Sequence, residues 1–229
     1  MGRCIYLILI IFMSGCFRFA HAQNQLVFRA SPCSFLDPLT PTILTGAEYR
    51  FHKRFAVGID YGLRTAKIKG NDWAHEKYND RYFKLKGEFK VFWHLRKNRW
   101  YSGVSGFYMP ESFDHRNGIL RTSAGTFNYE QAHIRRDVTG VLIKVGHLAS
   151  MSDHWSIDFF GGIGIRLIHS HHTAVTGLSA YTPYGGLVEY MIPMPSYDYD
   201  YPEKQNVHLE LGMKFNYLIF SVKDKKIVH

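Results

Sequence analysis

Hydrophobic and polar residues alternate along most of this chain with a period of two, which is the spacing of a β-strand with one apolar face. The alternation is clearest in residues 155–167, where Trp155, Ile157, Phe159 and the odd-numbered positions after them are apolar or glycine. No segment after residue 22 has a convincing helical period over ten or more residues. The pattern therefore predicts an all-β protein.

The same alternation recurs in enough segments to count the strands. Seven segments carry it: residues 43–51, 55–63, 83–93, 100–108, 138–147, 155–167 and 207–219. A closed bacterial transmembrane barrel made from one chain has an even number of strands. We place the eighth strand at residues 25–35, because Pro32 is tolerable near a strand end or at a bulge.

The links between these predicted strands are alternately variable and short. In chain order they are residues 36–41, 52–54, 68–81, 94–99, 109–137, 148–154 and 168–206. Transmembrane barrels have short periplasmic turns and longer external loops, and eight strands place both termini on the periplasmic side. The sequence thus predicts an eight-stranded antiparallel up-and-down transmembrane β-barrel with short periplasmic turns and long external loops.

An outward apolar face would bring aromatic residues together at the rim that carries the short turns, where they would form an interfacial girdle. These residues are Tyr49, Phe51, Trp93, Trp100, Tyr101, Trp155 and Tyr217. The same alternation turned inside out would fit a soluble barrel of the lipocalin type, which binds an apolar ligand. The systematic difference between the links and the aromatic strand ends favour the membrane barrel.

The inward face of the predicted barrel is charged. In a barrel of eight strands the side chains fill the interior, so we expect acidic and basic residues to pair there and to plug the lumen. The acidic residues are Glu48, Asp60, Glu88, Asp158 and Glu210, and the basic ones are Arg50, Arg64, Lys84, Lys86, Lys90, Arg166 and Lys214. A paired lumen of this kind predicts that a passive channel would be closed.

The first 22 residues predict export. A basic start at residues 1–3, an apolar core at residues 4–13 and a small-x-small site ending at Ala22 are typical of a secretory signal peptide. We therefore expect a signal peptide at residues 1–22 and the barrel domain at residues 23–229. A competing cut before Cys16 resembles a lipobox and would lipidate that cysteine. In the chain processed after Ala22 only Cys33 remains, so it has no intramolecular disulfide.

Charge and hydropathy narrow the functional classes. The chain has 28 Lys and Arg against 19 Asp and Glu, a formal charge of +9 that becomes +7 without Arg3 and Arg18. The basic residues are scattered over lumen positions and turns, so no patch supports nucleic-acid binding. No apolar run after residue 22 approaches the ~18 residues of a membrane-spanning helix.

Residues 210–217 (ELGMKFNY) resemble the carboxy-terminal strand signature of bacterial outer-membrane barrels: a polar residue, a glycine two positions later, then two aromatic residues. Here the chain continues past Phe220 into a basic tail. Residues 39–62 and 157–166 (IDFFGGIGIR) are similar to segments of small, uncharacterised outer-membrane barrels of the Bacteroidetes type. The resemblance implies a fold and a location in the cell outer membrane, reached through the barrel assembly machinery, and it carries no catalytic residues.

Histidines cluster just past the end of the clearest strand. His169, His171 and His172 lie in a predicted external loop, and His169 and His171 share a face of an extended segment. They would hold zinc only if a carboxylate or His147 came near. Ser170 points away from that face, so no His–Ser dyad of the outer-membrane lipid A deacylase kind is expected there. Solvated loop histidines are the simpler interpretation.

Two further predicted loops contain charged, histidine or tyrosine side chains that could bind a ligand. The link 109–137 contains Glu111, Asp114, His115, Glu130, His133, Arg135 and Arg136. The two arginines match lipopolysaccharide phosphates in chemistry, although they also suit a solvated rim. In the last loop Tyr197, Tyr199 and Tyr201 alternate with Asp198 and Asp200, which is a surface able to bind a protein or glycan or to pack as a rigid hairpin.

The sequence favours a monomeric, non-enzymatic outer-membrane barrel with a surface-structural or recognition role through its external loops, in contact with outer-membrane lipid and lipopolysaccharide. No catalytic, cofactor-binding or metal residues are assigned, and no cofactor is expected. The alternatives are an outer-leaflet enzyme acting on lipid A or a phospholipid, a small passive, porin-like channel, and a soluble periplasmic barrel.

Overall fold

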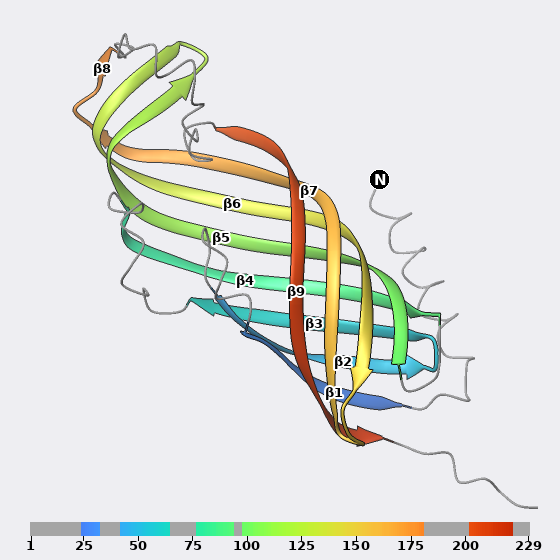
Figure 1. The fold of residues 1–229 in the computed structure, drawn as a ribbon. Helices are drawn as coiled ribbons and strands as arrows, with labels where there is room; N and C mark the ends of the chain where they lie inside the picture. Colours follow the sequence, from blue (N-terminus) through green and yellow to red (C-terminus); the bar gives the residue numbers. More distant parts are fainter. Residues whose placement is uncertain (1–23, 33–41, 65–76, 94–97, 181–201, 222–229) are drawn as a thin grey trace, which may run out of the picture.

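The computed structural model describes residues 24–32, 42–64, 77–93, 98–180 and 202–221, and nearly all of them lie in antiparallel strands (Figure 1). The strands are β1 (Gln25–Ser31), β2 (Thr42–His52), β3 (Phe55–Arg64), β4 (Lys77–Phe92), β5 (Asn98–Thr122), β6 (Gly125–Ser150), β7 (Trp155–Thr176), β8 (Ser179–Ala180) and β9 (Glu203–Ser221). Within these ranges no helix is long and apolar enough to cross a bilayer. The predicted signal peptide and Cys16 lie outside the described residues.

Eight of the strands close into a ring. Each pairs with its neighbour in the order β1-β2-β3-β4-β5-β6-β7-β9, and β9 pairs back with β1. The two-residue β8 lies outside the ring and pairs with β6 at Phe127 and Asn128. Each of the eight predicted strands falls on one of the eight ring strands, so the predicted number and order are confirmed.

The strand alternation places apolar side chains outside and polar ones inside. Leu211 on β9 is 89% exposed, whereas Lys214 on the same strand is 1% exposed. The exposed apolar residues include Ile59, Leu63, Phe89, Val104, Ile143, Ile163, Leu209 and Ile219. Because this is the arrangement of a barrel in lipid and the reverse of a soluble barrel, the lipocalin-type alternative is wrong.

The described short turns, after β2 and β6, lie at one end of the ring, together with the ends of β1 and β9 nearest the chain termini. Exposed aromatic residues gather at this rim: Tyr49, Trp93, Trp100, Trp155 and Tyr217, with Phe51 partly exposed. Tyr101 is the exception to the predicted girdle. It follows the outward Trp100 directly and therefore points into the lumen, where it is fully buried.

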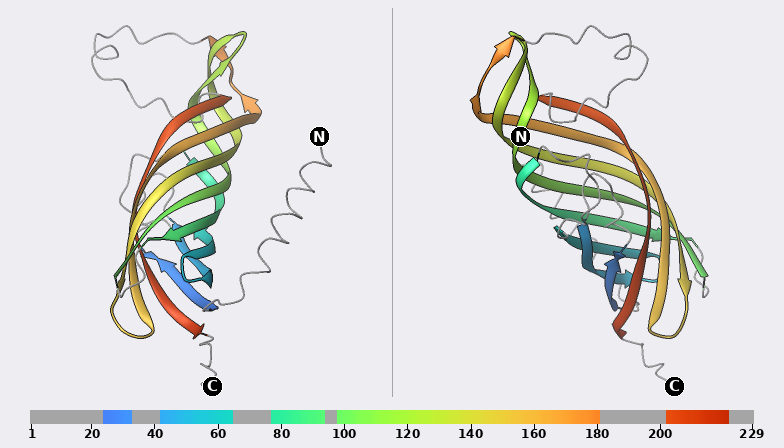
Figure 2. Two further views of the ribbon diagram at one scale, coloured as in Figure 1. Left: turned by 90° about the vertical axis from the view of Figure 1, so that its right-hand side faces the viewer. Right: turned by 60° about the vertical axis from the view of Figure 1, so that its left-hand side comes forward.

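The opposite end of the barrel is much taller on one side. β5 has 25 residues and β6 has 26, and their hairpin turn lies at Ser123 and Ala124, far beyond the ends of β2 and β3 (Figures 1 and 2). The prediction of a loop at residues 109–137 is therefore wrong. Residues 109–122, 125–137 and 168–176 continue β5, β6 and β7 as a twisted sheet, which we call the extension.

The extension forms because its residues keep alternating after the apolar outer belt ends. Its inward residues Phe113, Tyr129, Ala132 and Ile134 pack together and are almost fully buried, with Leu120 and Val175 against them. Polar residues at the outward positions hid this pattern from a search for apolar rows. The hydrophobic contacts on the inner face keep these strands together beyond the barrel wall.

Candidate functional site

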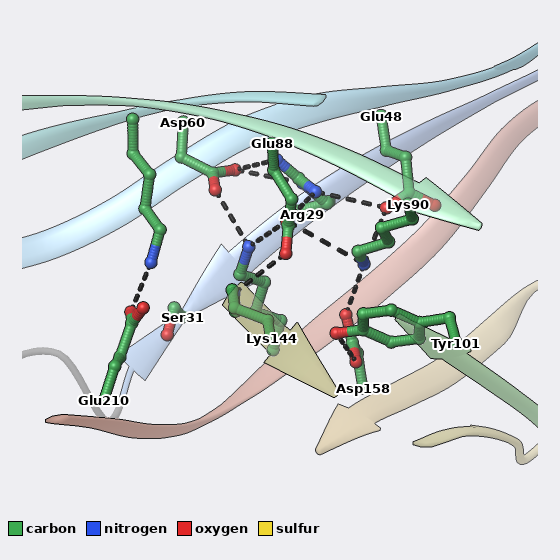
Figure 3. Close-up of polar contacts among 12 residues, drawn as sticks. Arg29, Ser31, Glu48, Asp60, Glu88, Lys90, Tyr101, Lys144, Asp158 and Glu210 are labelled. Atoms are coloured by element: carbon green, nitrogen blue, oxygen red, sulfur yellow. Dashed lines mark hydrogen bonds and ion pairs between the residues drawn. The ribbon is translucent and has the colours of Figure 1, made fainter. Parts of the chain in front are cut away.

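The centre of the lumen is occupied by a network of ion pairs (Figure 3). Arg29, on β1, contacts three carboxylates that come from three successive strands. Its Nη1 lies 3.1 Å from Glu48 Oε2 and 2.8 Å from Glu88 Oε2, and its Nη2 lies 2.7 Å from Asp60 Oδ1. One guanidinium thus links β1 to β2, β3 and β4 across the barrel interior.

Lysines on β4, β6 and β9 complete this network. Lys90 Nζ lies 2.8 Å from Glu48 and 2.6 Å from Asp158. Lys144 and Lys214 each lie 2.8 Å from Glu88, so that Glu88 accepts from three cations, and Lys214 also lies 3.0 Å from Asp60. Lys86 pairs with Glu210 on β9. These buried charges tolerate burial because each has an opposite charge beside it.

Aromatic rings close the lumen beside the charges. The Phe160 ring lies 3.7 Å from Lys144 Nζ and 5.3 Å from Lys214 Nζ, both cation–π distances. Tyr101 donates a 2.8 Å hydrogen bond to Asp158. Phe160 also packs with Ala56, Phe92, Tyr101 and Leu148. The lumen is therefore filled by side chains from many strands, and it holds a structural core.

Five predicted lumen acids occupy this network, and Arg50, Lys86, Lys90 and Lys214 pair with them as expected. Lys84 lies over the Phe107 ring at 5.1 Å, and the side chain of Arg64 lies outside the described residues. Two cations were missed, Arg29 and Lys144. Both lie in weakly alternating segments, where the neighbouring positions of each face mix polar and apolar residues.

The predicted pair Arg135–Arg136 is divided between the two faces of β6. Arg136 is buried and pairs with Glu111 on the inner face, whereas Arg135 is exposed on the outer wall. Adjacent residues of a strand point in opposite directions, so the two guanidinium groups do not act as a pair. Also on the inner face, His115 Nδ1 and the Tyr129 hydroxyl are hydrogen bonded at 2.8 Å.

The histidine cluster lies on β7, so its assignment to a loop is wrong. His169 and His171 share the outer face, as predicted, and His169 Nδ1 is 3.6 Å from Glu203 Oε1. Ser170 is buried on the inner face. His172 is also turned inward, 5.9 Å from the Tyr129 ring, and burial, together with the neighbouring His171, lowers its pKa.

His147 does not join these histidines. It lies against the Trp100 ring, at a centroid distance of 4.7 Å, at the opposite rim of the barrel. Among the residues that the structure describes, no group of three or more His, Cys, Asp or Glu side chains has the geometry of a metal site. Tyr197, Asp198, Tyr199, Asp200 and Tyr201 lie outside the described residues.

Asp114 and His133 face each other directly across β5 and β6 on the outer wall of the extension. His133 Nδ1 lies 2.7 Å from Asp114 Oδ1, and His133 Nε2 lies 3.1 Å from Ser112 Oγ. Asp114 and His133 were candidate residues in the sequence, whereas Ser112 was not. A Ser-x-Asp spacing on one strand was the available signal, since residues two apart share a face.

No known family profile matches the chain, and no curated protein is detectably similar to it in sequence. Several solved structures are similar to it. The crystal structure of a major outer membrane protein from Thermus thermophilus aligns over 87% of this chain and 100% of its own, with 11% identity and a TM-score of 0.44.

Two other solved structures align over 86% of this chain. CarO of Acinetobacter baumannii is covered over 97% of its length, with 8% identity and a TM-score of 0.37. Neisserial surface protein A, NspA, is covered over 94%, with 11% identity and a TM-score of 0.31.

Proposed function

We propose that this chain is an outer-membrane protein of a bacterium that spans the bilayer as a closed barrel and acts through its outer wall and its external extension. The observation that carries the proposal is the contrast between an exposed apolar belt with an aromatic rim and a charged, buried lumen. Only a hydrocarbon surrounding makes that distribution favourable, because in water the belt would be a very large exposed apolar patch.

We expect that this barrel does not conduct ions. Its lumen is blocked where Arg29, Lys144 and Lys214 converge on Glu88, and each of these four side chains is at least 94% buried. A water-filled pathway would require several of these ion pairs to separate, which is costly in a region of low dielectric constant. A porin-like role is accordingly disfavoured.

The extension is the part of the molecule that this proposal places outside the cell. As a recognition or surface-structural element it would meet lipopolysaccharide, a protein or a glycan, and it requires no cofactor. The barrel would be monomeric and would be inserted by the assembly machinery, which would read the signature at residues 210–217 on β9. Gly212 in that signature is required by packing, because a Cβ there would lie 2.5 Å from the Phe160 ring.

The test is fractionation of the producing cell followed by electrophoresis with and without boiling. We expect the protein in the outer-membrane fraction, with a mobility that shifts on heating, as a stable barrel gives. Planar-bilayer recordings of the same preparation should show no steady conductance. Recovery in the soluble periplasmic fraction without a heat shift would contradict the proposal, and steady conductance would contradict its closed lumen.

A second candidate function is favoured by one specific observation. The Ser112, His133 and Asp114 contacts on the outer wall have the order of a nucleophile, a base and an orienting carboxylate. This arrangement suits an acyl hydrolase that acts on outer-leaflet lipid, and it lies on β5 and β6 and not at the β7 histidines to which the sequence pointed.

A further inference from the structure

We propose that Ser112, His133 and Asp114 form a nucleophilic site that hydrolyses a fatty-acyl ester of a glycerophospholipid in the outer leaflet. The inference rests on the proposed placement of the barrel in the outer membrane, because it takes the outer wall of β5 and β6 to be in contact with lipid. It takes up the second candidate function given above and names its substrate class and reaction.

The three side chains have the hydrogen bonding that the chemistry needs. The Nδ1–H of His133 donates to Asp114 Oδ1 over 2.7 Å, which fixes the ring and leaves Nε2 as the acceptor for the Ser112 hydroxyl 3.1 Å away. Thr173 on β7 also donates to the His133 carbonyl at 3.2 Å and holds this part of β6 in place. A serine within reach of an oriented histidine is the recurring arrangement of acyl-transfer enzymes.

The site is open to the outside. The His133 side chain is 35% exposed and that of Asp114 is 44% exposed, and Ser112 is partly exposed between them. Irregularities of pairing lie on both sides: the β4–β5 register shifts between Tyr78 and Arg81, and Ala174 on β7 has a φ of +50° beside His133. Such bulges re-aim side chains next to functional sites.

The site lies at the outer edge of the apolar belt, where a barrel in a bilayer would meet the lipid head groups. On β5 the last large hydrophobic side chain that is exposed is Tyr108, and Ser112 lies four residues beyond it, about 13 Å along a tilted strand. Between them Pro110 on β5 pairs with Asp137 on β6, which pairs in turn with His169 on β7, so the outward row becomes polar on β6 and β7. Ser112 thus lies just outside the apolar belt.

Two arginines lie beside Ser112. In the strand register Arg81 on β4 is the partner of Ser112 on one side, and Arg135 on β6 is its partner on the other. Both are exposed and occupy outward positions. Guanidinium groups bind phosphate oxygens in a fork, so this row suits an ester that carries a phosphate a few atoms away.

Toward the apolar belt from the site, the outer wall has a groove at two paired glycines. Gly87 and Gly106 are directly paired, so β4 and β5 present no side chain there, and an open groove of about 710 Å³ runs over them, bordered by Leu85, Tyr108, Val141 and Ile165. A Cβ at Gly87 would meet nothing within 4 Å, and one at Gly106 would meet only the Gly140 carbonyl oxygen at 3.7 Å. Packing does not demand these glycines, and we assign the groove to one acyl chain of the phospholipid.

The reaction would run in two steps with water as the co-reactant. Ser112 Oγ attacks the ester carbonyl carbon while its proton passes to His133 Nε2. The bond to the glycerol oxygen then breaks, and that oxygen takes the proton from His133, which releases a lysophospholipid and leaves the acyl group on Ser112. A water molecule attacks this acyl ester, its proton passes to His133 and returns to Ser112 Oγ, and a free fatty acid departs.

The first experiment labels the folded, detergent-solubilised full chain with a fluorescent fluorophosphonate, which reacts only with activated serines. We expect labelling of the wild type and none of Ser112→Ala or His133→Gln, with Asp114→Asn reduced roughly 10²-fold or more. Ser102→Ala and His171→Gln are the matched controls, because they change an outward serine of β5 and an outward histidine of β7 without touching the three residues. The heat-dependent mobility shift shows that each variant is folded.

The second experiment defines the substrate. Mixed micelles containing phosphatidylethanolamine and, separately, purified lipid A are assayed for released fatty acid. Release from the phospholipid that depends on Ser112 supports the proposal, and release from lipid A alone would overturn the substrate assignment. Gly106→Leu should lower long-chain hydrolysis at least tenfold while leaving a short-chain p-nitrophenyl ester unaffected. Arg135→Gln should raise KM for the phospholipid more than it lowers kcat.

Failure of this proposal is separable from failure of the proposed function. A folded, heat-modifiable wild type that neither takes the fluorophosphonate nor releases fatty acid would overturn the esterase and leave the outer-membrane barrel intact. Conversely, labelling is measured in detergent and does not depend on where the cell places the protein.

Discussion

Polar side chains are concentrated in two regions of this molecule, the lumen and the outer wall of the extension. The two regions differ in the burial of these side chains and in their contacts with opposite charges. In the lumen the charged groups are almost fully buried, and Glu88 alone contacts four cations within 4 Å. On the outer wall the side chains of Asp114 and His133 are about a third or more exposed, and the two are hydrogen bonded to each other. The lumen charges therefore hold the fold together, whereas the outer side chains are accessible to a ligand.

The greatest loss of stability should follow from removing the carboxylate at the centre of the lumen network. Glu88→Gln leaves Arg29, Lys144 and Lys214 without their shared carboxylate, and breaking a buried ion pair from one side costs about 3–5 kcal/mol. We expect the free energy of unfolding in urea with phospholipid vesicles to fall by that order. Glu203→Gln is the control on the outside, where Glu203 is 79% exposed, and a change below ~1 kcal/mol is expected.

A double-mutant cycle measures the contribution of the contact between Arg29 and Glu88. Arg29→Gln together with Glu88→Gln removes one charge of each sign, so the double variant should lose less stability than the two single changes added together. A coupling of about 0.5–3 kcal/mol is typical for directly contacting groups. Additive losses measured in the same urea titrations would mean that the contact between Arg29 and Glu88 contributes little.

The next effect in size concerns one neutral donor in the lumen. Tyr101→Phe removes a 2.8 Å hydrogen bond to Asp158 and leaves a buried carboxylate with one donor fewer, which costs about 1.5–3 kcal/mol. Tyr217→Phe changes the same group on the exposed rim and should be nearly neutral. Equal losses for the two variants would show that the lumen hydroxyl has no special role.

The outer wall should respond in the opposite way. Ser112→Ala and His133→Gln remove partly exposed groups, so the free energy of unfolding should change by less than ~1 kcal/mol, although both abolish labelling by the fluorophosphonate. The same urea titrations measure the change, and the heat-dependent mobility shift reports the folded barrel. Loss of the folded barrel in either variant would assign these residues to the fold instead.

The smallest effect expected is a pH dependence of the extension. Burial, with His171 adding to it, lowers the pKa of His172, so the folded extension binds its proton less readily than an unfolded one. The stability that this gives is present above the ordinary histidine pKa and is lost as the pH falls. Protease cleavage within the extension should therefore be faster at pH 5 than at pH 7, and His172→Asn should reduce that difference. His115 and Tyr129 are the other titratable groups beside it.

The barrel itself could be predicted because its outer belt and inner face differ at every second residue, as in β7 and β9. The extension could not, because outward polar residues such as Ser112 and Asp114 broke the apolar rows although Phe113 and Ile134 continued the buried face. Two residues of the outer site, Asp114 and His133, could be named as candidates from the sequence. Ser112 could not be named, because its contact with His133 is set by the register between β5 and β6. The alternation within one strand does not determine that register.

The position of Arg29 also bears on how the first and last strands of the barrel are held together. β1 has seven residues and is joined to β9 over a short register, with an irregularity at Leu26, so few backbone hydrogen bonds close the wall along this line. Arg29 on β1 and Lys214 on β9 both pair with Asp60 and Glu88 on the strands behind them. Ion pairs inside the lumen thus hold the seam together, and this set of pairs is complete only when both edge strands are in place.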